Sequence, residues 1–240
     1  MPALAKLTLS LRVTGVRPDG YHLLDAEMVT LDLADELVFT DGDGLEVVDD
    51  HVGRPVPDGD DNLVRRALTA VGRRARVRLT KRIPTGAGLG GGSADAAAVF
   101  RWAGVDDPAL AATVGADVPF CVRGGRAQVR GVGEVLHPLP PIDRTFTLLI
   151  APFGCPTREV YRAWDRLGGP TAPGSNDLEA AALAVEPRLA DYRDRLGHAT
   201  GLSPLLAGSG STWFVEGAHP GPGRIVARTA TPPATRPMLG

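Results

Sequence analysis

Cysteine is scarce in this chain of 240 residues, which contains only Cys121 and Cys155. They form neither a Cys-x-x-Cys motif nor the dense framework of a small secreted domain, so two free thiols in a reducing cytosol are expected. No apolar run approaches the length of a membrane-spanning helix. Residues 1–13 alternate polar and apolar side chains where a signal peptide would have a continuous apolar block. These absences predict a cytoplasmic protein with no membrane partner.

The sequence also lacks an excess of positive or negative residues. The 26 Lys and Arg residues nearly balance 28 Asp and Glu residues, the net charge is −2, and no long run of one sign occurs. This balance argues against a nucleic-acid partner held mainly through phosphate contacts. No internal repeat is found. With 43% hydrophobic and 22% charged residues the chain is typical of a globular protein, and its length allows one large domain or two small ones.

The most informative stretch is residues 84–93, which read Pro-Thr-Gly-Ala-Gly-Leu-Gly-Gly-Gly-Ser. A strand-like run at 76–80 precedes it and an alanine-rich run at 94–100 follows it, which predicts a strand, a glycine loop and a helix. Glycine permits a positive φ and lets backbone N–H groups approach a ligand closely. Ser93 is expected to cap the helix, whose N-terminus adds a partial positive charge. The stretch therefore predicts a phosphate-binding loop in preference to a plain flexible turn.

Two better-known phosphate-binding loops fit less well. The P-loop requires Gly-Lys followed by Ser or Thr, and this sequence does not occur. Gly86, Gly88 and Gly91 do satisfy the spacing of the dinucleotide fingerprint, and Asp106 and Asp107 lie near the distance at which that motif needs an acidic residue. Those aspartates stand in Gly-Val-Asp-Asp-Pro, which is typical of a turn that opens a helix. A Rossmann-type oxidoreductase is therefore the weaker alternative.

Two charged residues stand in settings where the sequence leaves their role open. Residues 6–13 alternate without a fault, which predicts a half-buried strand with Lys6, Thr8 and Ser10 on its polar face. A lysine there is usually solvated. Asp117 lies among small and apolar neighbours, where a helix is expected to meet a strand. Because burying an unpaired carboxylate is costly, Asp117 is expected to cap a backbone or to act in catalysis.

Other candidates flank the two predicted binding regions. Tyr21 and His22 follow a turn at 17–20. They could grip a planar base, or they could simply begin a strand. Lys81 and Arg82 stand just ahead of the glycine loop, where their charge could meet nucleotide phosphates or remain solvated.

The remaining pattern mixes helices and strands. Leu139-Pro140-Pro141 predicts a linker between two units, and residues 229–240 are expected to form a disordered tail. A polar loop is expected at 49–60. Asn62 offers an N-cap for a helix that begins at residue 63. Further helices are expected at 108–114, 157–166, 176–185 and 187–196, and further strands at 28–33 and 36–40 (joined by a bend at Ala34-Asp35), 45–48, 126–130, 134–137, 146–151, 212–216 and 224–228.

A set of short motifs runs in order along the chain to about residue 216. The motifs are Ala5-Lys6-Leu7-Thr8-Leu9, Arg17-x-Asp19-Gly20-Tyr21-His22, Asp61-Asn62-Leu63, Lys81-Arg82-Ile83-Pro84 with the glycine loop, Gly115-Ala116-Asp117-Val118-Pro119, Gly131-Val132-Gly133-Glu134, Pro156-Thr157, Ser175-Asn176-Asp177-Leu178-Glu179 and Gly208-Ser209-Gly210. Each motif alone is weak, whereas the ordered set is very specific. On these residues the chain resembles the GHMP kinases, the superfamily of galactokinase, homoserine kinase and mevalonate kinase. Within it, the chain is most similar to the kinases that act on a cytidine diphosphate-linked methylerythritol.

The resemblance implies a two-lobed α+β fold. Its N-terminal α+β domain would occupy residues 1–141, and a smaller, shortened ferredoxin-like domain would occupy residues 142–240. It also implies ATP-dependent phosphorylation of a small-molecule hydroxyl in the cleft between the lobes. Lys6 and Asp117 match the catalytic pair, and Mg²⁺ would bridge ATP oxygens, with no protein ligand of the metal assigned. The expected assembly is a monomer or a weak homodimer.

The resemblance also assigns binding positions. Tyr21, His22 and Tyr161 would hold the cytosine of the substrate, and Thr8 and Thr157 would contact the substrate elsewhere. The positions matched to ATP are Asn62, Lys81, Pro84, Thr85, Gly86, Ala87, Gly88, Leu89, Gly90, Gly91, Gly92, Ser93 and Ala94.

The chain departs from the family pattern at several points. Thr8 stands where relatives often carry Asn, and Ala94 replaces a common second serine. Residues 217–223 contain two prolines and three glycines where relatives have a helix, so one helix of the C-terminal domain is predicted to be missing. Two alternatives remain: a GHMP kinase of the homoserine or mevalonate type, and a nucleotide-binding relative that has lost catalysis. The ring residues count against the first, and retention of Lys6 and Asp117 counts against the second.

Overall fold

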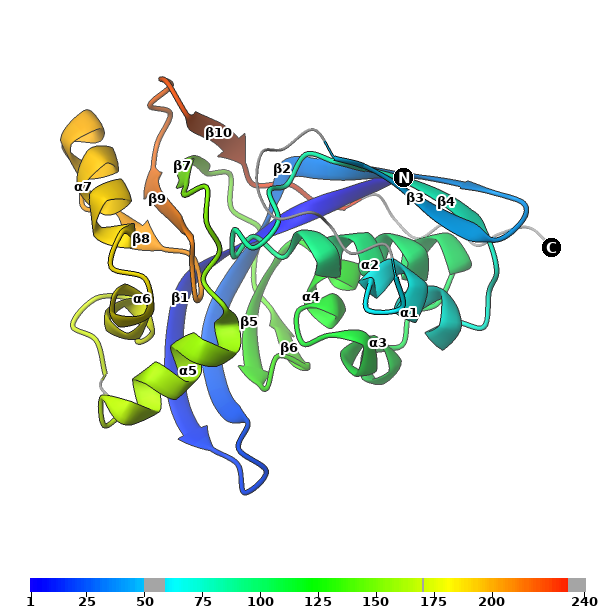
Figure 1. Ribbon diagram of the computed structural model, residues 1–240, viewed down its shortest axis with the longest axis horizontal. Coiled ribbons are helices and arrows are strands. Elements are labelled where there is room, and N and C mark those ends of the chain that lie inside the picture. The colour runs from blue at the N-terminus through cyan, green and yellow to red at the C-terminus, as the bar shows by residue number, and fades with distance from the viewer. Residues whose placement is uncertain (50–58, 170, 233–240) are drawn as a thin grey trace.

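Two long antiparallel strands run through the structure and connect its two halves (Figure 1). β1 (Pro2–Val16) pairs with β2 (His22–Thr40), with irregularities in register at three points. The computed structural model describes residues 1–49, 59–169 and 171–232. The predicted strand at 6–13 is confirmed as the central part of β1.

The expected bend at Ala34-Asp35 is wrong, because β2 continues through both residues. Asp35 pairs with Ala3 of β1 and is fully buried. Its carboxylate accepts hydrogen bonds from the backbone N–H groups of Arg82 and Ile83. A distant partner for this side chain thus removes the reason for a local turn.

The first sheet is built around β2. Its strands follow the order β3-β4-β2-β5-β6, and β1 also pairs with β2. β3 and β4 are parallel, and the other pairs are antiparallel. The added strands are β3 (Gly44–Asp49), β4 (Arg76–Lys81), β5 (Arg126–Gly131) and β6 (Val135–Pro138). The expected loop at 49–60 falls largely on residues 50–58, which lie outside the described residues.

Four helices gather on one side of this sheet (Figure 1). The central helix, α2, is buried from Ala94 to Arg101 and contacts β1 and β2. Asp107 caps the third by accepting the N–H of Leu110, and Pro108 occupies its first turn, so its predicted limits are confirmed. The helices are α1 (Leu63–Ala70), α2 (Gly91–Ala103), α3 (Pro108–Val114) and α4 (Val118–Arg123).

A second sheet of four antiparallel strands has the order β10-β7-β9-β8. The three helices predicted after residue 150 are confirmed, but α6 begins at Glu179, later than expected. Asn176 instead bridges distant segments: its side-chain nitrogen donates to the carbonyl oxygens of Leu206 and Gly208. The elements are β7 (Thr145–Ile150), α5 (Thr157–Arg166), α6 (Glu179–Val185), α7 (Leu189–Thr200), β8 (Leu205–Leu206), β9 (Thr212–Glu216) and β10 (Arg224–Arg228).

The C-terminal end of the chain differs partly from expectation. Residues 217–223 form no helix between β9 and β10, as predicted. Thr229 and Ala230, in contrast, belong to the fold. Thr229 donates its N–H to the carbonyl oxygen of Arg144, and Ala230 donates to Thr30 of β2. The disordered tail predicted from residue 229 is therefore wrong for these residues, and residues 233–240 lie outside the described part of the chain.

Both cysteines are free, as predicted, and both are buried. Burial raises the pKa of Cys121 to about 12 and that of Cys155 to about 11. Neither thiol is therefore suited to act as a nucleophile at neutral pH. Within the described ranges, no helix combines the length and the apolar character that crossing a membrane requires.

Candidate active site

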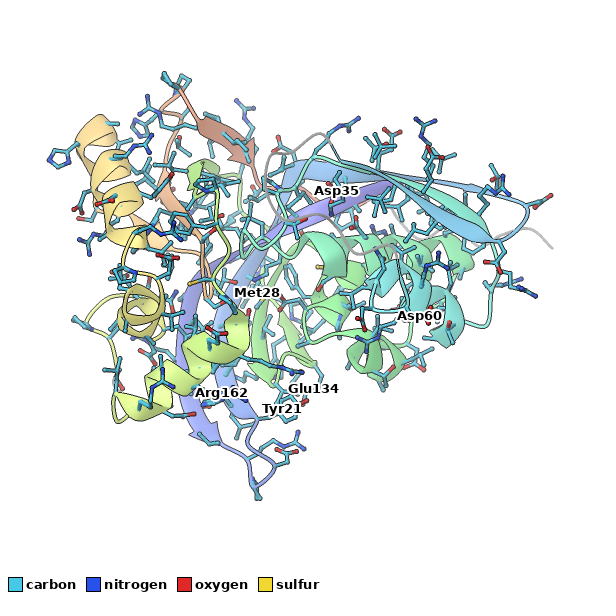
Figure 2. All side chains as sticks on the ribbon, in the orientation of Figure 1. Tyr21, Met28, Asp35, Asp60, Glu134 and Arg162 are labelled. Atoms are coloured by element: carbon cyan, nitrogen blue, oxygen red, sulfur yellow. The ribbon has the colours of Figure 1, made fainter. Side chains whose placement is uncertain are left out.

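A cleft of about 850 Å³ lies where β1, β2, the glycine loop and α5 meet. It contains almost every residue that the sequence singled out, from Lys6 at one end of the chain to Ser209 at the other. Figure 2 marks three of its lining residues: Met28 on β2, Arg162 on α5 and Tyr21, the last two lower in the view. The fold thus brings the predicted motifs of both halves to one site.

Lys6 and Asp117 form the charged centre of this cleft. Lys6 Nζ lies 3.4 Å from Asp117 Oδ2, and it donates a hydrogen bond of 3.1 Å to Thr8 Oγ1. The lysine side chain is nearly buried, with 7% of its surface exposed, whereas 30% of the aspartate side chain is exposed. Lys6 therefore pairs with one side of the carboxylate, and the exposed part of Asp117 can contact a ligand.

Asp117 precedes a helix, α4, where a strand had been predicted. It occupies the N-cap position of α4, but its side chain makes no capping hydrogen bond. The carboxylate is directed instead to Lys6. The capping role that the sequence left open is therefore excluded, and the ion pair takes its place.

The glycine loop enters α2 differently from the prediction. Gly90, and not Ser93, is the N-cap, and it adopts a left-handed conformation with φ +68° that favours glycine. The N–H of Ala94 makes the first helical hydrogen bond, to the carbonyl oxygen of Gly90. The N–H groups of Gly91, Gly92 and Ser93 precede that bond and lie at the cleft. Such a helix start is suited to an anion.

Neighbouring segments hold the loop from both sides. Leu89 accepts a hydrogen bond from the N–H of Lys6, which ties the loop to β1. A Cβ atom on Gly88 would lie 2.6 Å from the carbonyl oxygen of Gly210, so only glycine allows this contact with the second half. Ala94, also matched to ATP, is fully buried and is not part of the cleft lining.

The two other residues matched to ATP are both buried at the edge of the cleft. Asn62 caps α1, because its Oδ1 accepts the N–H of Val64. Lys81 lines the cleft, but its ammonium is hydrogen-bonded to Asp95 Oδ2 at 2.7 Å and to Asp35 Oδ2. Burial raises the pKa of Asp95 to about 7, although the positive charge of Lys81 opposes this effect.

The ring residues lie together at the other end of the cleft. The His22 and Tyr161 ring centroids are 4.6 Å apart with a tilt of 31°, and Trp164 packs edge-on against His22. His22 Nε2 lies 2.8 Å from Asp165 Oδ1. Tyr21 is 61% exposed at the rim. These rings come from β2 and α5, so the stacking surface is shared between the two halves.

Thr8 and Thr157 also line the cleft, and Thr8 accepts its hydrogen bond from Lys6 of the charged centre. Thr157, the first residue of α5, has its Oγ1 3.0 Å from Ser209 Oγ. The cleft also contains Arg158 and Arg162, for which the described residues provide no ion-pair partner. Two guanidinium groups one helical turn apart are suited to an anionic ligand.

Sequence reasoning missed four polar residues of the cleft lining, namely Asp95, Arg158, Arg162 and Asp165, and it also missed Asp35, which contacts Lys81. The spacing of the two arginines on a predicted helix, on either side of Tyr161, could have indicated them. The local signal at Asp35 indicated only a bend, because its partners, the N–H groups of Arg82 and Ile83, follow a different strand.

The side chains of the cleft also indicate how a metal ion could be held. In the described residues no three His, Cys, Asp or Glu side chains gather in a way that could hold one. Asp95 Oδ1 is a buried oxygen without a hydrogen-bond partner there, and its residue lines the cleft. Such a donor set fits a cation that receives most of its ligands from a bound nucleotide.

Comparisons with known proteins show the family. Residues 62–125 match the family described as GHMP kinases N terminal domain. The 4-diphosphocytidyl-2-C-methyl-D-erythritol kinase of Paracoccus denitrificans is 39% identical over 229 residues, covering 88% of this chain and 84% of that protein. The protein of the same name from Moorella thermoacetica is 42% identical over 203 residues, covering 77% and 70%.

Solved structures give the same result. The crystal structure of a 4-(cytidine 5'-diphospho)-2C-methyl-D-erythritol kinase superposes with a TM-score of 0.73 at 36% identity, covering 95% of this chain and 98% of that one. A mevalonate kinase from Methanococcus jannaschii has a TM-score of 0.53 at 12% identity, covering 96% and 98%, and shares the fold.

Proposed function

The chain belongs to the 4-diphosphocytidyl-2-C-methyl-D-erythritol kinases of the GHMP kinase superfamily, and we propose the mechanism by which its cleft acts. The reaction is the ATP-dependent phosphorylation of the 2-hydroxyl of 4-diphosphocytidyl-2-C-methyl-D-erythritol in the non-mevalonate isoprenoid pathway. The observation that carries the mechanism is the Lys6–Asp117 contact at 3.4 Å, with the glycine loop on one side and the ring residues on the other.

Asp117 accepts the proton of the attacking hydroxyl. Its partly exposed carboxylate can reach a ligand, and the ammonium of Lys6 lies beside it. Lys6 also offsets negative charge on the phosphoryl group as it is transferred. Phosphoryl transfer requires little covalent help from a protein, so positioning and charge compensation are the main contributions of this pair.

The glycine loop holds the phosphates of ATP. Its residues present backbone N–H groups at the start of α2, and Lys6 lies against Gly90, so the phosphates and the catalytic pair share one wall of the cleft. Asn62 borders the same region. Mg²⁺, entering with ATP, would neutralise phosphate charge there.

The acceptor lies along α5. His22 and Tyr161 would stack on its cytosine, with Tyr21 closing the rim. Thr157 and Thr8 lie nearer the charged centre, where the methylerythritol hydroxyl must reach Asp117. The positive charges of Arg158 and Arg162 would face the diphosphate between these ends.

A kinase assay with three acceptors tests the function. The purified protein with ATP and Mg²⁺ should form ADP in the presence of 4-diphosphocytidyl-2-C-methyl-D-erythritol, with new phosphate at the 2-hydroxyl by ³¹P NMR. Homoserine and mevalonate should react at least about 100-fold more slowly, because neither has a base to stack on the rings. Faster turnover of either one would reject the proposed substrate. ATP binding without any phosphorylation would favour a non-catalytic relative.

We also propose how the protein exists in the cell. It would consist of two domains, at residues 1–141 and 142–240, and act as a cytoplasmic monomer or weak homodimer. Light scattering after size-exclusion chromatography should give a mass near 25.1 kDa at low concentration. A stable higher oligomer would contradict this proposal.

A further inference from the structure

Three charged residues form a cluster in the interior beside the glycine loop. Asp35, Lys81 and Asp95 expose 0%, 5% and 3% of their surface. Lys81 Nζ donates to Asp95 Oδ2 at 2.7 Å and also to Asp35 Oδ2. The three come from β2, β4 and α2, so the cluster joins a sheet to the helix that packs on it.

Asp35 also holds the entrance of the loop. Its Oδ1 accepts the N–H of Ile83 at 2.7 Å and the N–H of Arg82. These two peptide groups directly precede Pro84, where the glycine loop begins. One carboxylate therefore holds both the backbone before the loop and the ammonium of Lys81.

Asp95 and Lys81 hold the exit of the loop. Asp95 lies in the second turn of α2, and Gly91, the first residue of that helix, packs against the ammonium, since a Cβ atom there would lie 3.2 Å from Lys81 Nζ. The loop at 84–90 is therefore fixed at its entrance by Asp35 and at its exit through Lys81 and Asp95.

Stability alone does not account for this arrangement. Buried ion pairs gain little over apolar residues of similar size, because desolvation offsets the attraction. Here two carboxylates share one ammonium, and that ammonium lies near a helix N-terminus, where a positive charge is unfavourable. What the cluster does provide is a defined distance between the two ends of the loop.

We propose that the Asp35–Lys81–Asp95 cluster positions the glycine loop, and that Lys81 serves nucleotide binding through the loop. The inference rests on the proposed kinase function. On this basis the cluster sets the affinity for ATP and leaves the binding of the acceptor unchanged, because the ring residues lie at the opposite end of the cleft.

Asp95→Asn and Asp35→Asn are the informative variants, and Glu36→Gln is the matched control. Glu36 is the next residue of β2 and forms an exposed ion pair with Arg82 at 3.2 Å. We expect both cluster variants to raise the KM for ATP at least about tenfold, to weaken ADP binding in calorimetry, and to leave the KM for the acceptor within about twofold. Glu36→Gln should change none of these values.

Lys81→Met separates positioning from direct contact. If Lys81 acts through the loop, Lys81→Met and Asp35→Asn should raise the KM for ATP to a similar extent, and the double variant should be little worse than either. A large effect of Lys81→Met with none from Asp35→Asn would overturn the inference in favour of direct contact between Lys81 and the nucleotide.

Asp95→Asn keeps the test decisive if Asp35→Asn fails to fold. The substitution keeps the shape of the side chain and removes one of the two carboxylates that share the Lys81 ammonium. A folded Asp95→Asn protein with wild-type KM for ATP would overturn the inference, as would an equal rise in both KM values. ADP calorimetry requires no acceptor. Loss of ADP binding in the variants would therefore support the cluster's role even if the wild-type protein failed to phosphorylate the proposed acceptor.

Discussion

Thr212 donates two hydrogen bonds to the carbonyl oxygen of Ala87, one from its backbone nitrogen at 3.2 Å and one from Oγ1 at 2.6 Å. Thr212 begins β9 of the second sheet and is fully buried, whereas Ala87 lies in the middle of the glycine loop. The conformation of the loop therefore depends on the second half of the chain as well as on the strand and helix that flank it.

Thr212→Val should raise the KM for ATP about 2- to 10-fold, the equivalent of one net hydrogen bond of about 0.5–1.5 kcal/mol. Valine keeps the shape of the side chain, and the backbone bond remains. Thr147→Val is the control, because Thr147 Oγ1 donates to the carbonyl oxygen of Gly217 and accepts the N–H of His219, away from the loop. Both variants should lose thermal stability. Equal effects of the two on ATP kinetics would contradict a local role for Thr212.

Gly88→Ala should raise the KM for ATP at least about tenfold. Gly88 has φ +77°, and an added Cβ would collide with the backbone oxygens of Gly210 and Ala207. Gly104→Ala is a matched control, because Gly104 has φ +71° with open space around it. Steady-state kinetics of the two variants separate the collision from the backbone strain that they share. A Gly88→Ala enzyme as active as Gly104→Ala would argue against the close contact.

Asp117→Asn should lower kcat by about 10²–10⁴-fold and leave both KM values nearly unchanged, the usual scale for a lost general base. Lys6→Met should also lower kcat, and the double variant should be little worse than either single one, because the two residues act as a unit. If the ion pair only stabilised the fold, Asp117→Asn would lower the melting temperature, and the folded fraction would turn over at nearly the wild-type rate.

Tyr161→Ala should raise the KM of the acceptor about 5- to 100-fold, in line with a stacking contribution of about 1–3 kcal/mol per base. The KM for ATP should stay within about twofold, because Tyr161 is proposed to contact the acceptor and not ATP. Tyr192 packs against Phe153 and does not line the cleft, so Tyr192→Ala is the control for lost tyrosine packing. A parallel rise of both KM values in Tyr161→Ala would identify Tyr161 as a packing residue.

Asp95 should make stability depend on pH. Its folded-state pKa of about 7 lies above the value of about 3.9 for an unfolded carboxyl group. The folded protein therefore binds more protons between these values, and the contribution of Asp95 to the free energy of unfolding falls as the pH rises from about 4 through 7. Asp95→Asn removes this dependence. Its melting temperature relative to wild type should increase from pH 4.5 to pH 8, and a constant difference would contradict the raised pKa.

Elements specified by neighbouring residues were predictable from the sequence. The limits of α3 follow from the Asp107 cap, Pro108 and the terminating Gly115, and all of these interactions are local. The glycine loop was recognised for the same reason, because the conformations it needs are properties of glycine itself. The start of α2 was misjudged by three residues, since Gly90 can cap the helix in a left-handed conformation that Ser93 would not adopt.

Pairings between distant residues were decided only by the tertiary structure. The alternation of polar and apolar residues showed that Lys6 and Thr8 share one face of β1. It did not show that Asp117 contacts Lys6 on that face. Asp35 was predicted to be a bend because Asp favours turns when nearby backbone groups are its only partners. Its actual partners are the N–H groups of Arg82 and Ile83 and the ammonium of Lys81. The residue types alone indicated a phosphate-binding loop and a group of ring residues that could stack on a base. Their arrangement around one cleft required the packing of the two sheets, because the free energy of a buried charge depends on partners that no local segment supplies.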